Sequence, residues 1–269
     1  MSIEYKEITT HQDFDQCIEL QRSIFGLTDT DLISPLFLKL VSRNNPPVGI
    51  SLGVFLESND KSELIGFILG IATFIESSIY TLSLGIRQDH QNKIFGYKLL
   101  LKYREIALSK KVLYMFGIFD PLESHLSRLY FSSLGFIGIK YEEEAYILSN
   151  IDTKKYVPAD SLLIRWDFKS ESTLKKLSGF KTPVTQELLQ NIPIATDIYM
   201  PESPNILVEI PGNFIQMKND DIESARKWRE STRNIFAEYI NNRHYIVSDC
   251  YSFNQEDTRK TYYLLEEKQ

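Results

Sequence analysis

The chain has 269 residues, of which 43% are hydrophobic and 12% aromatic, and its formal net charge is −6. This composition argues against disorder, and the acidic surplus argues against a general nucleic-acid binder, which needs Lys and Arg to displace counterions. The two cysteines, Cys17 and Cys250, are too few for a disulfide framework and fit a reducing compartment. The N-terminus is too charged for a signal peptide, and the longest apolar run, 64–75, is too short for a membrane helix. We expect a soluble, cytoplasmic protein with one large domain or two modest ones.

The first part of the chain predicts two helices followed by three strands. Thr10 and Asp13 form a capping box before apolar residues at helical spacing, and Gly26 ends this helix. Ser34 and Pro35 are typical of a second, short helix that begins with proline. The predicted strands that follow are 48–57, 64–75 and 78–86.

A helix is predicted next over about 94–109, because its apolar residues share one face and its charged residues the other. The apolar run 112–118 predicts a strand. Asp120, Pro121 and Glu123 are typical of a helix start, with Asp as the cap and Pro at the first helical position. Gly135 ends that helix, and two strands, 136–140 and 145–149, follow it.

The remainder divides into a connector and a smaller folded part. Prolines and polar runs within 151–205 predict a connector that contains one strand, at 161–168. Beyond it, 206–269 predicts a β-α-β-β piece that echoes the closing part of the first 150 residues. We expect a domain over 1–150, a connector over 151–205, and a half-lobe over 206–269 that packs on the first domain.

The segment from Tyr80 to Gly96 reads as a strand, a polar loop and the start of a helix. The N-terminus of a helix presents unpaired N–H groups and a partial positive charge, so it suits a pyrophosphate. The alternative is an ordinary strand-to-helix turn. Gly85, inside the strand, either leaves room beside a ligand or marks a β-bulge without one.

With the later run from Leu129 to Phe136, this order resembles the GNAT superfamily of acyl-CoA-dependent N-acyltransferases over about residues 3–150. The family's helix ending, L-Y-x-x-L-G-F, appears here with one residue more before Leu134. A narrower resemblance, to a little-characterised branch of predicted GNAT acetyltransferases, rests on 119–122, 157–166, 208–212 and 225–229 and extends over nearly the full chain. The resemblance implies an α/β (α+β) fold with a mixed, mostly antiparallel sheet flanked by helices.

The resemblance also implies which residues bind the co-substrate, acetyl-CoA or another acyl-CoA. Main-chain groups of Leu84, Gly85 and Ile86 would hold the pantetheine arm. The family's phosphate loop, Q/R-x-x-G-x-G/A, corresponds to Gln91, Asn92, Lys93, Ile94, Phe95 and Gly96. Ile94 replaces the first glycine and could obstruct close approach of the backbone, whereas Lys93 could compensate with its charge.

Tyr130 matches the family's tyrosine that is placed to donate a proton to the leaving sulfur, although it also falls on an apolar stripe that predicts core packing. Glu76, His90 and Glu143 are candidate bases because they lie near predicted strand ends or the loop, but each also fits a solvated position. Water could remove the amine proton instead. The histidines and cysteines have no metal-ligand spacing, so no metal is expected.

The expected function is transfer of an acyl group, with acetyl the favoured one, from acyl-CoA to a primary amine of a small molecule. One alternative is N-succinylation of amino acids. Another is a non-catalytic binding module with a degenerate CoA loop, which Ile94 favours. No nucleic-acid or membrane partner is expected. The sequence leaves the acceptor and the oligomeric state open, because acceptor contacts come from variable loops.

Overall fold

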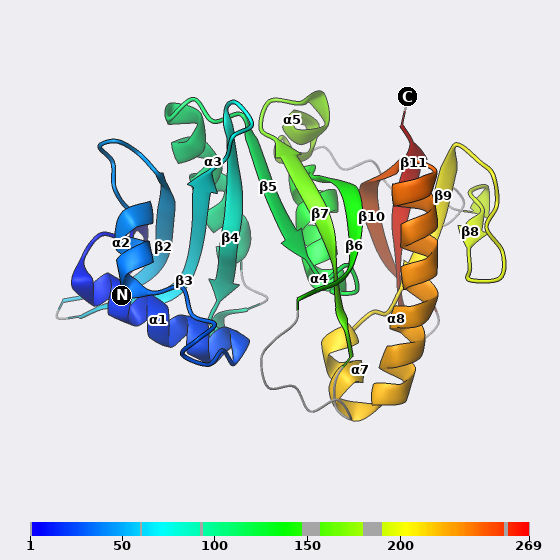
Figure 1. Cartoon of the computed structure of the whole chain (residues 1–269), viewed down its shortest axis with the longest axis horizontal. Coiled ribbons are helices and arrows are strands. Elements are labelled where there is room, and N and C mark those ends of the chain that lie inside the picture. Colours follow the sequence, from blue (N-terminus) through cyan, green and yellow to red (C-terminus); the bar gives the residue numbers. More distant parts are fainter. Residues whose placement is uncertain are drawn as a thin grey trace. The chain divides into compact units, whose positions relative to one another are not determined.

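The computed structural model describes residues 2–59, 61–91, 94–146, 157–179, 190–255 and 258–268. The chain divides into two compact units, Met1–Phe116 and Gly117–Gln269. Figure 1 labels the helices and strands of both. No helix in the described ranges is long and apolar enough to cross a membrane. The proposed domain limits at 150 and 205 stay a prediction.

The first unit is built on a sheet in which each of four strands pairs antiparallel with the next, and a fifth strand joins in parallel. The strands are β1 (Ser2–Glu7), β2 (Gly49–Ser58), β3 (Lys61–Ala72), β4 (Ser78–Ile86) and β5 (Tyr114–Phe119). The helices are α1 (His11–Phe25), α2 (Pro35–Val41), the short 3-10 turn η1 (Gln88–His90) and α3 (Phe95–Ser109). The expected mixed, mostly antiparallel sheet with flanking helices is confirmed.

The capping box predicted for the first helix is present in α1. The Thr10 hydroxyl accepts a hydrogen bond from the Asp13 amide at 3.1 Å, and the Asp13 carboxylate accepts one from the Thr10 amide at 3.0 Å. Gly26 ends the helix with a left-handed φ of 63°. These local bonds fix where α1 begins and ends, as the sequence predicted.

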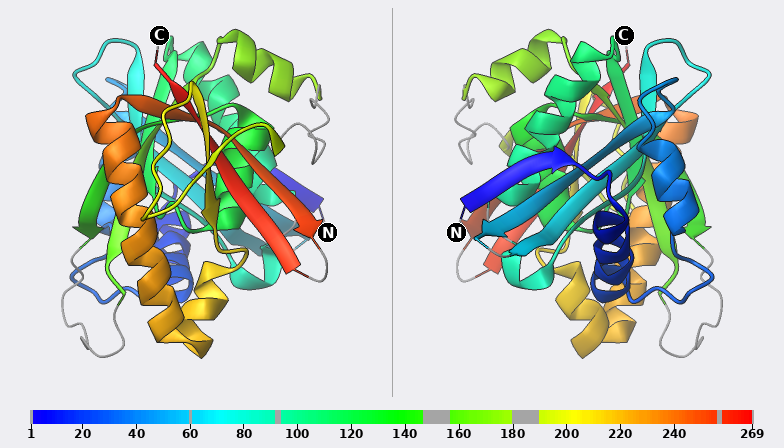
Figure 2. Two further views of the ribbon diagram at one scale, coloured as in Figure 1. Left: turned by 90° about the vertical axis from the view of Figure 1, so that its right-hand side faces the viewer. Right: turned by 90° about the vertical axis from the view of Figure 1, so that its left-hand side faces the viewer.

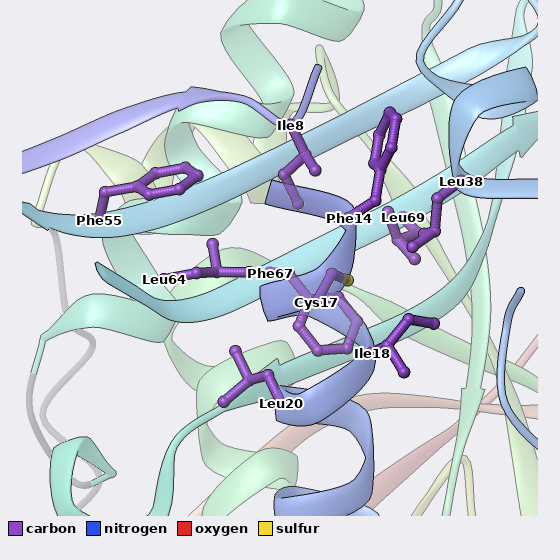
Figure 3. Packing of buried hydrophobic residues seen from close by; sticks show 10 residues of the cluster. All are labelled: Ile8, Phe14, Cys17, Ile18, Leu20, Leu38, Phe55, Leu64, Phe67 and Leu69. Atoms are coloured by element: carbon purple, nitrogen blue, oxygen red, sulfur yellow. The ribbon is translucent and has the colours of Figure 1, made fainter. Parts of the chain in front are cut away.

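The core of the first unit has helices on both faces of the sheet. Figure 2 shows α1 on one face of the sheet, and Figure 3 shows its apolar side chains together with those of β2 and β3. The cluster consists of Ile8, Phe14, Cys17, Ile18, Leu20, Leu38, Phe55, Leu64, Phe67 and Leu69. A Cβ on Gly70 would meet the Tyr103 hydroxyl of α3 at 2.1 Å, so α3 packs closely on the opposite face.

The second unit has a sheet of six strands in the order β7-β6-β10-β11-β9-β8. The strands are β6 (Ile137–Tyr146), β7 (Ala159–Asp167), β8 (Ile194–Ala195), β9 (Asn205–Ile210), β10 (Tyr245–Gln255) and β11 (Thr258–Glu267). The helices are α4 (Ser124–Ser127), the π-helical η2 (Arg128–Leu134), α5 (Glu171–Leu177), α7 (Phe214–Asp220), α8 (Ile222–Phe236) and the π-helical η3 (Ala237–Asn242).

Two expectations for this unit are corrected. The two strands expected at 136–140 and 145–149 form one strand, β6, to Tyr146, and 147–149 lie outside the described residues. The helix expected to begin at Asp120 begins at Ser124. The Asp120 side chain instead accepts a hydrogen bond from the Leu122 amide at 3.0 Å, and its carbonyl accepts one from the Glu123 amide. These bonds make a turn of the residues expected to cap the helix.

The π-helical segment η2 accounts for the extra residue before Leu134. A π-helix closes its hydrogen bonds over five residues instead of four, so it takes up one inserted residue without disturbing the elements on either side. Gly135, with φ 82°, then ends the helix and leads into β6. The strand that follows the helix is therefore kept, at the expense of regular α-helical geometry.

The second unit contains two repeats of the same pattern, a helix with a π-helical end followed by two antiparallel strands. The first repeat, 124–167, comprises α4, η2, β6 and β7; the second, 222–267, comprises α8, η3, β10 and β11. Tyr130 corresponds to Tyr239, and the left-handed Gly135 to His244, whose φ is 61°. The ring of each tyrosine contacts the aromatic ring six residues later, Phe136 at 5.0 Å in the first repeat and Tyr245 at 5.2 Å in the second.

The strands of the two repeats match as well. Register shifts occur between Gly138 and Lys140 in β6 and between Val247 and Asp249 in β10, so both first strands carry a bulge at the same place. Gly138 and Val247 occupy corresponding positions and pair with each other where β6 meets β10. The expected echo between the C-terminal piece and the preceding region is therefore present, and the repeats meet side by side.

Candidate functional site

The C-terminal half of β4 is separated from its parallel neighbour. The register of β4 with β5 covers only Ser78, Ile79 and Tyr80, whereas β4 continues to Ile86. The register with β3 also shifts after Thr81, which leaves Leu82 as an extra residue. A bulge of this kind bends a strand and increases its twist. The result is a strand whose last residues leave the parallel ladder.

The backbone of that half-strand presents groups away from β3. The Arg87 amide donates to the Ile65 carbonyl at 2.8 Å. Because antiparallel residues alternate between bonding their partner and facing away, Gly85 directs its N–H and C=O to β3, and Leu84 and Ile86 direct theirs to the opposite edge. Consistent with this, the Ile86 carbonyl accepts a hydrogen bond from Gln91 Nε2 at 3.0 Å.

Gly85 has a different role from the one suggested by its lack of a side chain. A Cβ at this position would lie 2.9 Å from Ile24 Cδ1 and 3.1 Å from Phe25 Cζ. The C-terminal turn of α1 therefore fills the space that Gly85 leaves. The glycine permits the close packing of α1 on β4, and the room beside it is not available to a ligand.

The start of α3 offers unpaired backbone N–H groups. Ile94 is the N-cap with helical φ and ψ, and no side chain in the described ranges caps it. The first N–H groups of such a helix have no intrahelical partner. The Ile94 side chain is 56% exposed, whereas Phe95 is buried. Asn92 and Lys93 lie outside the described residues.

The loop between β4 and α3 is held by a charged network. Arg87 donates to Glu63 Oε1 at 2.6 Å and to Asp89 Oδ1 at 2.8 Å. The His90 Nδ1 atom lies 2.6 Å from Asp89 Oδ1, and the His90 ring contacts the ring of Phe95. Hydrogen bonds from Arg87 and then from His90 lower the pKa of Asp89 to about 2. His90 therefore serves to shape the loop, which weakens its case as a base.

Tyr130 lies in η2 and is buried within the second unit. Its ring makes an edge contact with Phe119 at 5.1 Å and a tilted contact with Phe136 at 5.0 Å. These contacts confirm that the apolar stripe packs in the core. They also fix the direction of the tyrosine side chain, which a proton donor requires.

Glu76 and His90, the candidate bases of the first unit, do not come together. Glu76 is exposed before β4 begins, and His90 follows its end, so about 30 Å of strand separates them. Glu143 is exposed on β6, with a carboxylate oxygen 3.7 Å from Arg233 Nη1. Across the described residues, no group of three or more His, Cys, Asp and Glu side chains is arranged to hold a metal ion.

The sequence reasoning missed Glu123, whose carboxyl group lies half-buried at the N-cap of α4. Burial and then the charge of Asp120 raise its pKa to about 7, against smaller opposing effects of Lys218 and Arg229. A carboxyl group with a pKa near neutrality is the kind that can exchange protons at physiological pH. No signal in the sequence indicates this, because the largest cause, burial of the carboxyl group, depends on the tertiary fold.

The second unit also brings together residues from three of the motifs quoted for the narrower resemblance. Arg229 Nη2 lies 2.5 Å from Asp120 Oδ2, and Arg229 Nε lies 3.9 Å from Asp160 Oδ2. Arg233 binds both oxygens of Asp160, at 2.8 and 3.1 Å. Asp160 and Arg229 are both buried. Buried charges are stable only when paired, so these motifs form one structural cluster.

No protein-family model and no curated protein matches the sequence. Among solved structures, the chain is similar to the ribosomal-protein-S18-alanine N-acetyltransferase from Escherichia coli, with 10% identity, 63% of this chain and 96% of that one covered, and a TM-score of 0.47. It is similar to Arabidopsis thaliana NAA60 in complex with a bisubstrate analogue, with 17% identity, coverage of 62% and 98%, and a TM-score of 0.49. The PaiA N-acetyltransferase from Thermoplasma acidophilum, in complex with coenzyme A, matches at 21% identity, coverage of 62% and 99%, and a TM-score of 0.42. At these identities no functional residue can be carried over from them.

Proposed function

We propose that the chain is a GNAT-type N-acyltransferase that moves an acyl group, with acetyl favoured, from acyl-CoA to a primary amine of a small molecule. The observation that carries this proposal is the geometry of β4. Its last residues leave the parallel ladder after Tyr80 and direct the backbone groups of Leu84 and Ile86 away from β3. Such groups can pair with the amides of a pantetheine arm as a neighbouring strand would.

The loop and helix that follow β4 support the same proposal. The uncapped N-terminus of α3 presents N–H groups and a partial positive charge, which suit a pyrophosphate. In this proposal Gln91, Asn92, Lys93, Ile94, Phe95 and Gly96 form the phosphate loop. The exposure of the Ile94 side chain supports binding, because the side chain is not packed over the backbone.

Tyr130 is proposed as the general acid. In the reaction, the neutral amine attacks the thioester carbonyl carbon, the C–S bond breaks, and the thiolate takes a proton from the tyrosine hydroxyl. The amine nitrogen loses one proton to water, and the tyrosinate takes a proton back from solvent, so the products are the amide and free CoA thiol. The motif from Leu129 to Phe136 supports this role, and the ring contacts of Tyr130 supply the orientation that it requires. The binding of CoA by β4 and the following loop and the proton donation by Tyr130 can be tested separately.

The experiment is titration calorimetry of the purified protein with acetyl-CoA and succinyl-CoA, followed by a thiol-release assay over a panel of primary amines and amino acids. Binding of either CoA ester and amine-dependent thiol release are expected. Faster release with succinyl-CoA and amino acids would favour N-succinylation over acetyl transfer. The absence of binding at millimolar CoA ester would contradict the proposal and favour the alternative of a non-catalytic binding module.

A further inference from the structure

The turn that precedes the helix of Tyr130 is held by the second repeat and the elements just before it. We call residues 120–127 the β5–α4 turn. Arg229 of α8 pairs with Asp120 at 2.5 Å, and its guanidinium also lies over the ring of Phe214 at 5.0 Å. Ser124 donates to the Gly212 carbonyl at 2.6 Å. The first residue of the turn and its central Ser124 are therefore tied to residues 109 and 88 positions away in the chain.

Tyr263 of β11 makes buried hydrogen bonds to the same turn. Its hydroxyl donates to the Pro121 carbonyl at 2.6 Å and lies 2.5 Å from Ser127 Oγ. The side chain is fully buried, and its ring makes an edge contact with Phe131 at 5.5 Å. One hydroxyl thus joins the start of the turn to the helix that continues into η2.

The residues that Arg229 and Tyr263 contact are connected to Tyr130, either through a ring contact or directly in the chain. Asp120, which Arg229 holds, directly follows Phe119, and the Phe119 ring contacts that of Tyr130 at 5.1 Å. Phe131, which Tyr263 contacts, directly follows Tyr130 in the chain. Tyr130 is therefore fixed on one side through a ring contact and on the other through its own helix.

We propose that the second repeat acts in catalysis by positioning Tyr130, with Tyr263 and Arg229 as positioning residues that fix the β5–α4 turn. This inference rests on the proposed role of Tyr130 as general acid. Reactions that depend on a placed proton donor are sensitive to displacements of about 1 Å, so loosening the turn slows the chemical step. Binding of the acyl donor does not depend on the placement of that proton.

The test compares two tyrosine variants that each lose one buried hydroxyl. Tyr263→Phe removes the bonds to the β5–α4 turn and keeps the ring. Tyr239→Phe, the control, removes the bond from the corresponding tyrosine of the second repeat to the Pro201 carbonyl at 2.7 Å. We expect Tyr263→Phe to lower kcat about tenfold or more with KM for acyl-CoA within about twofold, and Tyr239→Phe to leave kcat within about twofold.

A double-mutant cycle tests whether the effect runs through Tyr130. In a Tyr130→Phe background, Tyr263→Phe should cost less than about twofold in kcat. A full tenfold loss in that background, or an unchanged kcat in the wild-type background, would overturn the inference. If Tyr263→Phe does not fold, Ser127→Ala removes the contact from the other side and takes its place in the same cycle.

The result also separates this inference from the proposed function. If Tyr130→Phe turns over like the wild type, the acid role and the positioning role both fall. If Tyr130→Phe is slow and Tyr263→Phe is not, only the positioning role falls. If the wild type binds no CoA ester, the proposed function itself is wrong.

Discussion

The two repeats of the second unit share a framework but differ in what precedes it. The first follows β4, a strand of nine residues, then a polar loop, α3 and β5. The second follows β8, a strand of two residues, then the short segment 196–204, β9 and α7. Tyr239, which corresponds to Tyr130, donates its hydroxyl to the carbonyl of Pro201 in that segment. The comparison teaches that one pattern can carry a candidate site in one repeat and serve as support in the other.

The largest expected effect concerns the ion pair that ties the repeats together. Arg229→Ala should lower the free energy of unfolding by about 3–5 kcal/mol, because it removes the partner of Asp120 and one of the two arginines beside the buried Asp160, which then keeps Arg233 alone. Urea unfolding followed by circular dichroism measures this. Lys175→Ala, which breaks an exposed pair with Glu171, is the control and should cost less than about 1 kcal/mol. Equal small losses would contradict a structural role for the pair.

The two corresponding tyrosines should differ in their effect on turnover. Tyr130→Phe should lower kcat by about 10²-fold, because a positioned acid contributes about that factor, whereas Tyr239→Phe should change it by less than about twofold. Steady-state thiol release measures both. If the two variants lose activity equally, the distinction between a catalytic and a supporting repeat is wrong.

The pH dependence of the free energy of unfolding tests the burial of Glu123, which lies beside Asp120 in the β5–α4 turn. Burial and Asp120 raise its folded pKa from 4.5 to about 7, so the folded protein holds this proton more tightly than the unfolded chain does. The associated stability is fully present below about pH 4.5 and is lost as pH rises through about 7. Glu123→Gln should therefore raise the free energy of unfolding by roughly 1–3 kcal/mol at pH 8, with little change at pH 4.5.

The matched control for that measurement is Glu230→Gln, which changes an exposed carboxyl on α8. Its effect on stability should be small and similar at both values of pH. Lys218 and Arg229 also face Glu123 and oppose the rise in its pKa. A Glu123→Gln variant whose stability follows the wild type across the whole pH range would show that folding does not raise the pKa of Glu123.

The smallest expected effect concerns the loop that only the first repeat follows. Ile94→Gly introduces the glycine of the GNAT pattern that the loop resembles and removes a branched side chain at the N-terminus of α3, where no side chain of the described residues caps the helix. We expect KM for acyl-CoA to fall by about threefold with kcat unchanged, because backbone approach to a pyrophosphate becomes easier. Ile198→Gly, at another highly exposed isoleucine, is the control. A rise in KM would indicate that Ile94 itself contacts the ligand.

Local signals in the sequence predicted most of the first unit. The bounds of β4 agree with the structure, and Thr10, Asp13 and Gly26 fix both ends of α1 through bonds within a few residues. Period and capping chemistry act over short distances, so a single sequence contains them. The parallel pairing of β4 with β5, which ends at Tyr80, depends on a strand distant in the sequence. Only the structure reveals where this pairing ends.

The failures share a non-local cause. Asp120 resembles a helix cap, but Arg229, 109 positions away, engages its carboxylate and the helix begins later. Gly85 suggested space for a ligand, but Ile24 and Phe25 fill it. In each case a distant residue decides the local structure.

The pairing of Gly138 with Val247 shows what joining two copies in one chain makes possible. A Cβ on Gly138 would lie 2.9 Å from both Val247 Cβ and Leu162 Cδ2, so this crossing point holds one valine and has no room for a second side chain. A symmetric pair of separate subunits would place the same residue on both sides of such an axis. Because the two repeats are joined in one chain, corresponding positions can hold different residues, as Gly138 and Val247 do, and each repeat can take a different role.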